Sequence, residues 1–523
     1  MRLGRKTHIR IIRTVSFAAC LASSTLILAS QADKPVDKGA EEGLPFSKVY
    51  ETVAANFADP VDPDHAIFDG AIRSMLATLD PFCSFLDADQ YEQQRQFEQG
   101  EAQGFGSVLL IAPERVQVLQ VAPGSPSSRA GLGPGDEIVA INGQRCDRLS
   151  IESLVELLER VRSQPVRLGV IHPGEVVAHD HRLNPVDFPM PTVDISFLLQ
   201  PGIAYMHVAS FEGGTLQEVL EALRQLGGAN LQGLLLDLRG NHGGALDAAV
   251  GLAGLFLGPD VLVVAQRGRA VPEKSFRTMA EPVHYDAALV VLVNGETAGT
   301  AEVLTAALQE HDRALIAGEP TLGKGVVESV TALSSGTGLR LTTAQYFTPQ
   351  GRLIQRPLPG SALGMLGSAP NAHPSLGQRF HTDNGRPTAA GGGIAPDVAI
   401  PAPKLDPWLV ALDTQETFTS FASEYLTTHA KVDRSFEPGE QILALFRDYL
   451  QRRRLPVPQA SWEQNQDYLR RGIKAGLLTL IFGLSAGDEV MTRSDPQVQE
   501  AAKVFSDVDS LLKPPYLSRQ ESH

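Results

Sequence analysis

The chain has 523 residues, of which 43% are apolar, and a formal net charge of −15. This length exceeds what one ordinary hydrophobic core holds, so we expect several domains. The acidic charge argues against nucleic acid as a partner, because phosphate binding needs clustered Lys and Arg side chains.

Residues 1–32 have the layout of a secretory signal peptide. Basic residues come first, an apolar stretch follows, and Ser30-Gln31-Ala32 forms a small-x-small cleavage site. We therefore expect an exported protein of the periplasm or cell envelope. The alternative is an uncleaved anchor, although the apolar stretch is short and interrupted by serines. Such an anchor is the only membrane contact that we expect.

Residues 33–100 alternate helical periodicity with turns and predict a helical N-terminal segment. Residues 101–185 then carry short strands, turns and one amphipathic helix near 150–162. Within this second unit lie Gly131-Leu132, Gly135-Asp136 and Ile141-Asn142-Gly143, in that order. The order and spacing of these residues resemble a PDZ domain, which is a small β-barrel with helices.

The PDZ resemblance places a loop that binds a peptide carboxylate at Gly104, Phe105 and Gly106. Glycines free successive backbone N–H groups to converge on a terminal carboxylate, and an exposed strand edge pairs with the peptide. The implied partner is the C-terminus of a protein or peptide, with an apolar tail. The alternative interpretation is that these three residues are only a tight entry into a strand.

Residues 186–404 read as alternating strands and helices, which predicts an α/β core whose parallel strands are buried on both faces. The stretch 356–393 within it is rich in Gly, Pro, Ser and Ala, and we expect a mobile insertion there. Residues 405–523 return to helical periodicity and predict a helical C-terminal extension. We find no chemistry in that extension.

Three segments of the core have small residues at sharp turns. In residues 289–302 an apolar strand turns sharply at Gly299 into a helix, and we call this strand-to-helix turn the first elbow. Gly243 and Gly244 form a second elbow of the same kind. The third segment has Lys324 between two glycines. Together they resemble the carboxyl-terminal-processing peptidases, a serine/lysine-type family of PDZ-containing, tail-specific proteases. The resemblance implies an α/β protease-like core with an inserted PDZ domain and helical N- and C-terminal segments. It also implies serine-type endopeptidase activity near the C-termini of envelope proteins.

In that family, a serine at a helix N-terminus attacks the peptide carbonyl, a lysine amine takes its proton, and main-chain N–H groups hold the oxyanion. The resemblance places the serine at Gly299 and the general base at Lys324. It places the oxyanion donors at the N–H of Thr300 and in the elbow of Gly243 and Gly244. The alternative for Lys324 is an ordinary lysine in a surface turn.

Two departures from the family pattern make hydrolysis doubtful. Gly299 has no hydroxyl, and glycine is also an acceptable helix N-cap three residues ahead of Glu302. Glu328 occupies the place where active relatives usually have glutamine. A carboxylate there would hold Lys324 in its ammonium form and make it a worse base. Whether the chain is an enzyme is therefore uncertain.

A neighbouring residue is a possible substitute for the missing serine. Thr300 lies one residue along, but this shift at a helix start rotates the side chain by about 100°, away from the lysine. Thr297 is expected to cap the helix. His242 stands where the family commonly has proline, and a lone loop histidine is more often solvated than catalytic.

The sequence shows no convincing cofactor site. Gly318, Gly323 and Lys324 have the spacing of a phosphate-binding P-loop, but Gly325 replaces the Ser or Thr that binds magnesium, and a strand follows instead of a helix. Beyond the signal, Cys83 and Cys146 are the only cysteines and lie far apart. We expect no cofactor and no metal.

Three hypotheses remain. The first is a pseudoprotease that binds or regulates partners through their C-termini. The second is an active peptidase that uses Thr300 with Lys324. The third is a non-catalytic PDZ scaffold, in which Lys324 is exposed and the elbow of Gly243 and Gly244 does not face it.

Overall fold

The computed structural model describes residues 37–98, 103–112, 115–187, 191–279, 284–358, 380–389, 392–429 and 432–512. The predicted signal peptide, residues 1–32, lies outside the described residues. Among the helices that are described, none is long and apolar enough to cross a membrane.

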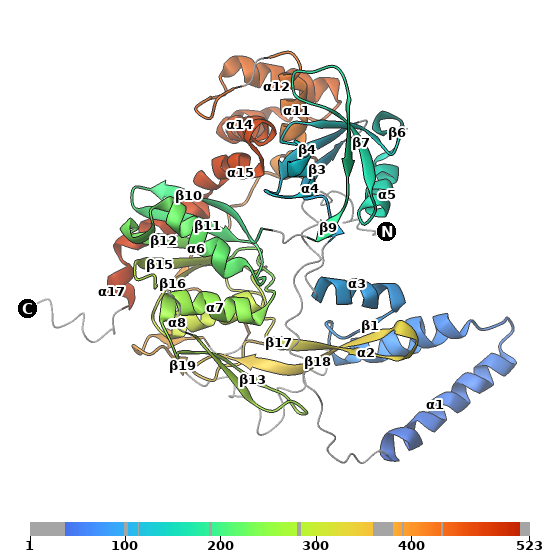
Figure 1. The fold of residues 1–523 in the computed structure, drawn as a ribbon. Helices are drawn as coiled ribbons and strands as arrows, with labels where there is room; N and C mark the ends of the chain where they lie inside the picture. Colours follow the sequence, from blue (N-terminus) through green and yellow to red (C-terminus); the bar gives the residue numbers. More distant parts are fainter. Residues whose placement is uncertain are drawn as a thin grey trace, which may run out of the picture.

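The N-terminal segment is helical, as predicted, and is joined to the core by a short strand. Its elements are α1 (Asp37–Asn56), the π-helix η2 (Asp64–Ile72), α2 (Arg73–Leu79), β1 (Ser84–Leu86) and α3 (Ala88–Glu98). Strand β1 pairs antiparallel with β18 (Gly338–Phe347) of the core, with Ser84 opposite Arg340. Helix α1 extends away from the body of the molecule (Figure 1). The pairing of β1 carries the turn before it, residues 80–83, to the core.

The second unit has the small sheet and helices expected of a PDZ domain. Its strands are β3 (Ser107–Ala112), β4 (Arg115–Val121), β5 (Glu137–Ile141), β6 (Gln144–Arg145), β7 (Val166–Ile171) and β8 (His179–Leu183). The sheet order is β3-β4-β5-β7-β8, with β6 beside β5, so β3 is an edge strand of this sheet. Helices α4 (Pro126–Arg129) and α5 (Ile151–Val161) and the 3-10 helix η3 (Cys146–Arg148) complete the unit.

Helix α5 follows directly from its sequence. Ser150 caps its N-terminus by accepting from Ser153 N–H, and Leu154, Leu157 and Val161 recur on one face and are buried. The pair β2 (Gln103–Gly104) and β9 (Val186–Asp187) joins the two ends of the unit where the chain enters and leaves it.

The α/β core contains a largely parallel sheet in the order β10-β11-β12-β15-β16-β21. These strands are β10 (Val193–Gln200), β11 (Ile203–Val208), β12 (Gly233–Asp237), β15 (Ala288–Val293), β16 (Leu315–Gly318) and β21 (Val398–Ala399). Only β10 runs antiparallel to its neighbour. One hydrophobic cluster covers each face of the sheet, which confirms that its strands are buried on both sides.

The helices of the core pack on one face of this sheet. They are α6 (Thr215–Leu226), α7 (Leu246–Leu257) and α8 (Thr300–Glu310), with the short 3-10 helix η4 (Gly228–Asn230) after α6. The opposite face is covered by helices of the C-terminal extension, α16 (Pro496–Lys503) and α17 (Val508–Leu512), with η6 (Val504–Ser506) between them. The extension therefore completes the core.

A second, antiparallel sheet lies beside the first. It contains β1, β18, β13 (Leu262–Arg267) and β14 (Lys274–Arg277), with β17 (Val326–Ala332) paired to β18 and the 3-10 helix η5 (Ser334–Gly336) between β17 and β18. The expectation of one series of alternating strands and helices was too simple, because β13 belongs to this second sheet. Apolar periodicity identifies a buried strand but not the sheet that it joins.

The remaining extension helices form a group that contacts the PDZ unit through α14 and the core strand β10 through α15. They are α10 (Pro407–Thr414), α11 (Thr417–Leu426), α12 (Glu440–Arg452), α13 (Gln459–Gln464), α14 (Gln466–Phe482) and α15 (Leu484–Arg493). Figure 1 shows α14 and α15 beside β3 and β4, above the core. Leu110 and Leu119 of the PDZ strands share one hydrophobic cluster with these helices.

The predicted insertion is only partly described. Residues 359–379 and 390–391 lie outside the described residues. Residues 380–389, which we expected to be mobile, form a hairpin of β19 (Phe380–His381) and β20 (Pro387–Thr388). Arg386 holds this hairpin on the core through ion pairs with Asp312 at 2.6 Å and Asp397 at 2.8 Å. The composition did not predict this hairpin, because Asp312, one of the residues that hold it, lies 74 positions from Arg386 in the sequence.

Candidate catalytic site

The first elbow joins β15 to α8 and has Gly299 at the N-cap of the helix. Its backbone angles are φ +63° and ψ −127°, a conformation that residues with a side chain rarely adopt. A Cβ at this position would lie 3.1 Å from the carbonyl oxygen of His242. The expected place of the nucleophile is therefore in a turn whose backbone favours glycine, and glycine supplies no hydroxyl.

The second elbow joins β12 to α7 and depends on two glycines. Gly243 and Gly244 have φ values of +96° and +142°. A Cβ on Gly244 would lie 2.1 Å from the carbonyl oxygen of Phe211, because the two residues form a parallel β-bridge. Phe211 N–H donates to Gly243 O, and Ala245 N–H donates to Phe211 O.

The two elbows are in direct contact. They follow the neighbouring parallel strands β12 and β15, so both lie at the carboxyl edge of the sheet. Ala298 N–H donates to Asn241 O at 2.8 Å. The Thr297 hydroxyl donates to Leu238 O at 2.8 Å, so it ties the elbows together, and the predicted capping role of Thr297 is wrong. Gly299 caps the helix in its place.

The main-chain donors differ from the expectation. The N–H of Gly243 donates to the Asn241 side chain at 2.8 Å, within its own elbow. A Cβ at Gly243 would lie 2.8 Å from the backbone nitrogen of Thr300, the first residue of α8. Glycine at this position therefore leaves the space beside that N–H group open. The N–H of Thr300 stays a predicted oxyanion donor, as the family pattern implies.

The loop that carries Lys324 is fixed to α8 by Glu302. This fully buried carboxylate accepts from the N–H groups of Gly323 and Lys324, each at 2.7 Å. It also accepts from the Thr321 hydroxyl at 2.5 Å and from Gly299 N–H at 3.1 Å. Burial raises the pKa of Glu302 to about 7, against these hydrogen bonds, which lower it. Glu302 thus sets the position of the lysine relative to the first elbow.

The side chain of Lys324 is buried and ion-paired. The residue is 8% exposed, and its Nζ lies 2.7 Å from Glu328 Oε1. The ring of Phe82 covers the ammonium group at 4.8 Å from the ring centroid. The alternative of an exposed surface lysine is therefore excluded. A general base needs its amine free to accept a proton, whereas this amine faces the carboxylate of Glu328.

The contact between Phe82 and Lys324 was not predicted from the sequence. Phe82 comes from the turn before β1, in which the Asp80 carboxylate accepts from Phe82 N–H at 2.8 Å and from Cys83 N–H at 2.9 Å. The sequence does not show that the pairing of β1 with β18 brings this turn to Lys324.

The Thr300 hydroxyl is directed to the second elbow. It donates to Gly244 O at 3.3 Å, and the residue is 5% exposed. The amine of Lys324 is directed to Glu328. The two groups that a threonine-lysine mechanism needs are therefore each engaged with another partner.

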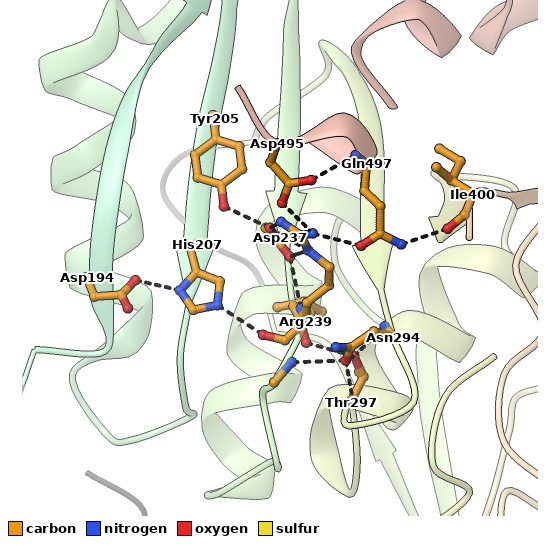
Figure 2. A network of polar contacts seen from close by, with 12 residues as sticks. Asp194, Tyr205, His207, Asp237, Arg239, Asn294, Thr297, Ile400, Asp495 and Gln497 are labelled. Carbon is orange, nitrogen blue, oxygen red and sulfur yellow. Dashed lines mark hydrogen bonds and ion pairs between the residues drawn. The ribbon is translucent and has the colours of Figure 1, made fainter. Parts of the chain in front are cut away.

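A buried polar network supports the second elbow from behind (Figure 2). Asp237, at the end of β12, accepts from the Tyr205 hydroxyl at 2.7 Å and from Arg239 Nη2 at 2.7 Å. Arg239 Nη1 donates to Asp495 at 2.7 Å and to Gln497 at 2.9 Å, both at the start of α16. Burial would raise the pKa of Asp237, but Arg239 outweighs it and lowers that pKa.

His207 fixes the backbone of the same elbow. Its Nδ1 lies 2.6 Å from Asp194 Oδ1, and its Nε2 lies 3.0 Å from the carbonyl oxygen of Arg239. Both partners only accept, so the ring satisfies both as an imidazolium that donates from each nitrogen. Burial would lower the pKa of His207, but the Asp194 carboxylate outweighs it and raises the pKa to about 9. This network was not foreseen from the sequence.

The expected carboxylate loop lies on a large cavity. Gly106 has φ +75°, the Phe105 carbonyl accepts from Ser127 N–H, and the Gly106 carbonyl accepts from Ala122 N–H. Gly104, Phe105 and Gly106 line a cavity of about 2440 Å³ that also reaches His242 on the second elbow. Gly299, Thr300 and Lys324 are not among the described residues that line it.

Two sequence families match the chain. Peptidase family S41 matches residues 202–360, and a PDZ domain matches residues 117–171. A carboxyl-terminal-processing protease of Synechocystis sp. is 37% identical over 286 residues, which cover 54% of this chain and 66% of that protein. Chloroplastic carboxyl-terminal-processing peptidase 2 of Arabidopsis thaliana is 30% identical over 379 residues, covering 66% of this chain and 74% of that protein.

The chain belongs to the carboxyl-terminal-processing protease family. A solved structure of a photosystem II D1 C-terminal processing protease is 27% identical, covers 69% of this chain and 88% of that chain, and has a TM-score of 0.37. The family, the fold class and the presence of a PDZ domain are as predicted.

No group of three or more His, Cys, Asp or Glu residues in the described ranges is arranged to hold a metal ion. Cys83 and Cys146 are both buried as free thiols.

Proposed function

We propose that this member of the family binds the C-termini of exported proteins and does not cleave them. Two observations carry the proposal: Lys324 pairs with Glu328 at 2.7 Å, and the nucleophile place, Gly299, has no side chain. The nucleophile is absent, and the amine expected to act as the base is paired with a carboxylate. The assignment of Gly299, Lys324 and Glu328 to these places rests on the family pattern.

Tail capture is supported by the PDZ unit. Strand β3 is an edge strand, so its backbone groups are available to pair with an added peptide strand. The loop of Gly104, Phe105 and Gly106 precedes this strand, where converging N–H groups would bind a carboxylate. Leu109 and Ile111 of β3 and Leu158 of α5 line the adjoining cavity, which favours an apolar tail.

Export is part of the same proposal and rests on residues 1–32. Their basic start, apolar stretch and small-x-small site are those of a secretory signal. The proposed partners are therefore proteins of the periplasm or cell envelope with accessible C-terminal tails.

The test is a titration with an unstructured peptide that has an apolar C-terminus, as the free acid and as the amide. We expect the free acid to bind at least about tenfold more tightly, because the amide lacks the negative charge and the second acceptor oxygen of a carboxylate. Mass spectrometry of the recovered peptide is expected to find it intact after long incubation.

Equal affinity for the acid and the amide would contradict carboxylate capture. Cleavage by the wild type that is lost in both Lys324→Ala and Thr300→Val would contradict the loss of catalysis and favour the threonine-lysine mechanism.

A further inference from the structure

The cavity beside the carboxylate loop has a wall that the PDZ unit and the protease core do not provide. Helix α15 contributes Leu484, Ser485, Asp488, Met491 and Thr492 to the lining. These positions are one, three or four residues apart, so they form one face of the helix. Helix α14 adds Tyr468 and Arg471, which are three residues apart. Two extension helices therefore each turn one face to the cavity.

The position of this wall is fixed on the PDZ side by close packing. Leu110 of β3 and Leu119 of β4 are both 2% exposed and lie in one cluster with Leu477 and Leu480 of α14. A Cβ on Gly135 would lie 2.7 Å from the Leu480 carbonyl oxygen, so the PDZ turn and the end of α14 are in direct contact. Close packing of this kind leaves little freedom for the two parts to slide.

The wall is fixed on the core side by polar contacts. Arg493, the last residue of α15, donates to Leu198 O of β10 at 2.8 Å and lies over the Phe197 ring at 4.3 Å. Two residues later, Asp495 pairs with Arg239 at 2.7 Å (Figure 2). The wall is therefore connected to the loop that leads from β12 to the second elbow.

We propose that α14 and α15 are part of the tail-binding site, where they contact the segment of a captured tail that lies upstream of its carboxylate. This inference rests on the proposed capture of tails by the PDZ unit. The occupant is an extended polypeptide, because the cavity is continuous from the carboxylate loop and the edge of β3 to His242 on the second elbow. A tail that pairs with β3 and continues toward the core passes between the PDZ unit and the extension.

The chemistry of the wall fits a peptide of mixed composition with one acidic residue. Tyr468, Leu484 and Met491 offer apolar surface, and the flexible thioether of methionine adapts to different side chains. Arg471 lies 5.9 Å from the Tyr468 ring centroid, and no carboxylate of the described residues forms an ion pair with it. An acidic side chain upstream of the tail's carboxylate would supply that partner.

The test places a photoreactive benzoylphenylalanine at Ser485, which is exposed and lines the cavity. The matched control places it at Gln499, which is exposed on α16 outside the cavity. A tail peptide of about twelve residues with a free carboxylate is expected to cross-link from Ser485 at least about tenfold more than from Gln499. The amidated peptide is expected to lose this difference.

A peptide that binds in solution but labels both positions equally would overturn the inference and leave the proposed function standing. Cross-linking from Ser485 to residues 513–523 of the chain itself, in the presence of bound peptide, would also overturn it. A peptide that does not bind at all would contradict the proposed function and this inference with it.

A second measurement uses peptide length. Arg471→Glu is expected to weaken a tail of about twelve residues with an upstream Glu by about fivefold, and to leave a tail of about four residues unchanged. Arg148→Glu makes the same charge change at an exposed PDZ position outside the cavity and should alter neither affinity. An equal loss for long and short tails would contradict contact between the wall and the upstream segment.

Discussion

Lys324 and Glu328 form an ion pair of 2.7 Å in which both side chains are less than a tenth exposed. Glu328 also lies 4.0 Å from the guanidinium of Arg340, so this carboxylate is shared between two cations. Removing one partner of a buried ion pair is costly, so this contact contributes to the structure of the site. A general base would need its amine free to accept a proton, whereas the amine of Lys324 is engaged with Glu328.

Glu302 is expected to hold the lysine loop in place. In Glu302→Gln the amide nitrogen cannot accept from main-chain N–H groups, so at least one of the amides of Gly323, Lys324 and Gly299 loses its partner. We expect a loss of about 2–4 kcal/mol in the free energy of unfolding at about pH 8, measured with urea. Glu296→Gln, at an exposed position in the same elbow, is the control and should cost little.

His207 predicts a dependence of stability on pH. The folded pKa of His207, about 9, lies above the ordinary value of 6.5, so the folded state holds the proton more tightly. The contribution of His207 to the free energy of unfolding is therefore complete below about pH 6.5. It is lost as the pH rises through about 9, and this lowers the free energy of unfolding by up to about 3 kcal/mol. Urea unfolding at several pH values should show this decline in the wild type and a shallower one in His207→Asn. His65→Asn, at an exposed histidine, should keep the wild-type slope.

Asp495 is expected to stabilise the junction between the extension and the core. Its carboxylate pairs with Arg239 through one oxygen and caps α16 through the other, which accepts from Gln497 N–H at 2.8 Å. Asp495→Asn keeps the cap but removes the charge, and should cost about 1–3 kcal/mol. Asp406→Asn makes the same change at the N-cap of α10, where Asp406 accepts from Trp408 N–H, and should cost less. Equal costs would contradict a specific role of the pair with Arg239.

Gly299 is expected to resist substitution. A serine there must adopt φ near +63°, and its Cβ must displace the carbonyl of His242 by a few tenths of an ångström. We expect Gly299→Ser to lower the free energy of unfolding by about 1–3 kcal/mol. Gly351 also has a positive φ, +80°, but open space around it, so Gly351→Ser reports the backbone cost alone. A smaller loss in Gly299→Ser than in Gly351→Ser would contradict the tight contact.

Much of the fold was predictable because its signals are local. The elbows follow from apolar strands that end in glycines, and the PDZ unit follows from the spacing of its turns. The contacts between distant segments were not predictable. The pairing of β1 with β18, which brings Phe82 to Lys324, depends on residues more than 200 positions apart.

The sequence names the candidate site residues through the family pattern, and the structure adds hydrogen bonds that the sequence did not predict. The sequence places Gly299, Lys324 and Glu328 in the family pattern, and the charge of Glu328 already indicates a paired lysine. It does not reveal that Gly243 N–H donates to Asn241, or that Asp495 reaches Arg239 from the extension. Those partners are set by tertiary packing, which helical or strand periodicity does not predict.

The most direct test of the central claim is cleavage of a tail peptide with an apolar C-terminus by three proteins: the wild type, Gly299→Ser, and the double variant Gly299→Ser/Glu328→Gln. The account predicts no cleavage by the wild type and little by the single variant, because the amine of Lys324 stays paired with Glu328. It predicts the most cleavage by the double variant, which regains the hydroxyl and replaces the carboxylate beside the lysine with an uncharged amide. Wild-type cleavage as fast as that of the double variant would contradict the account.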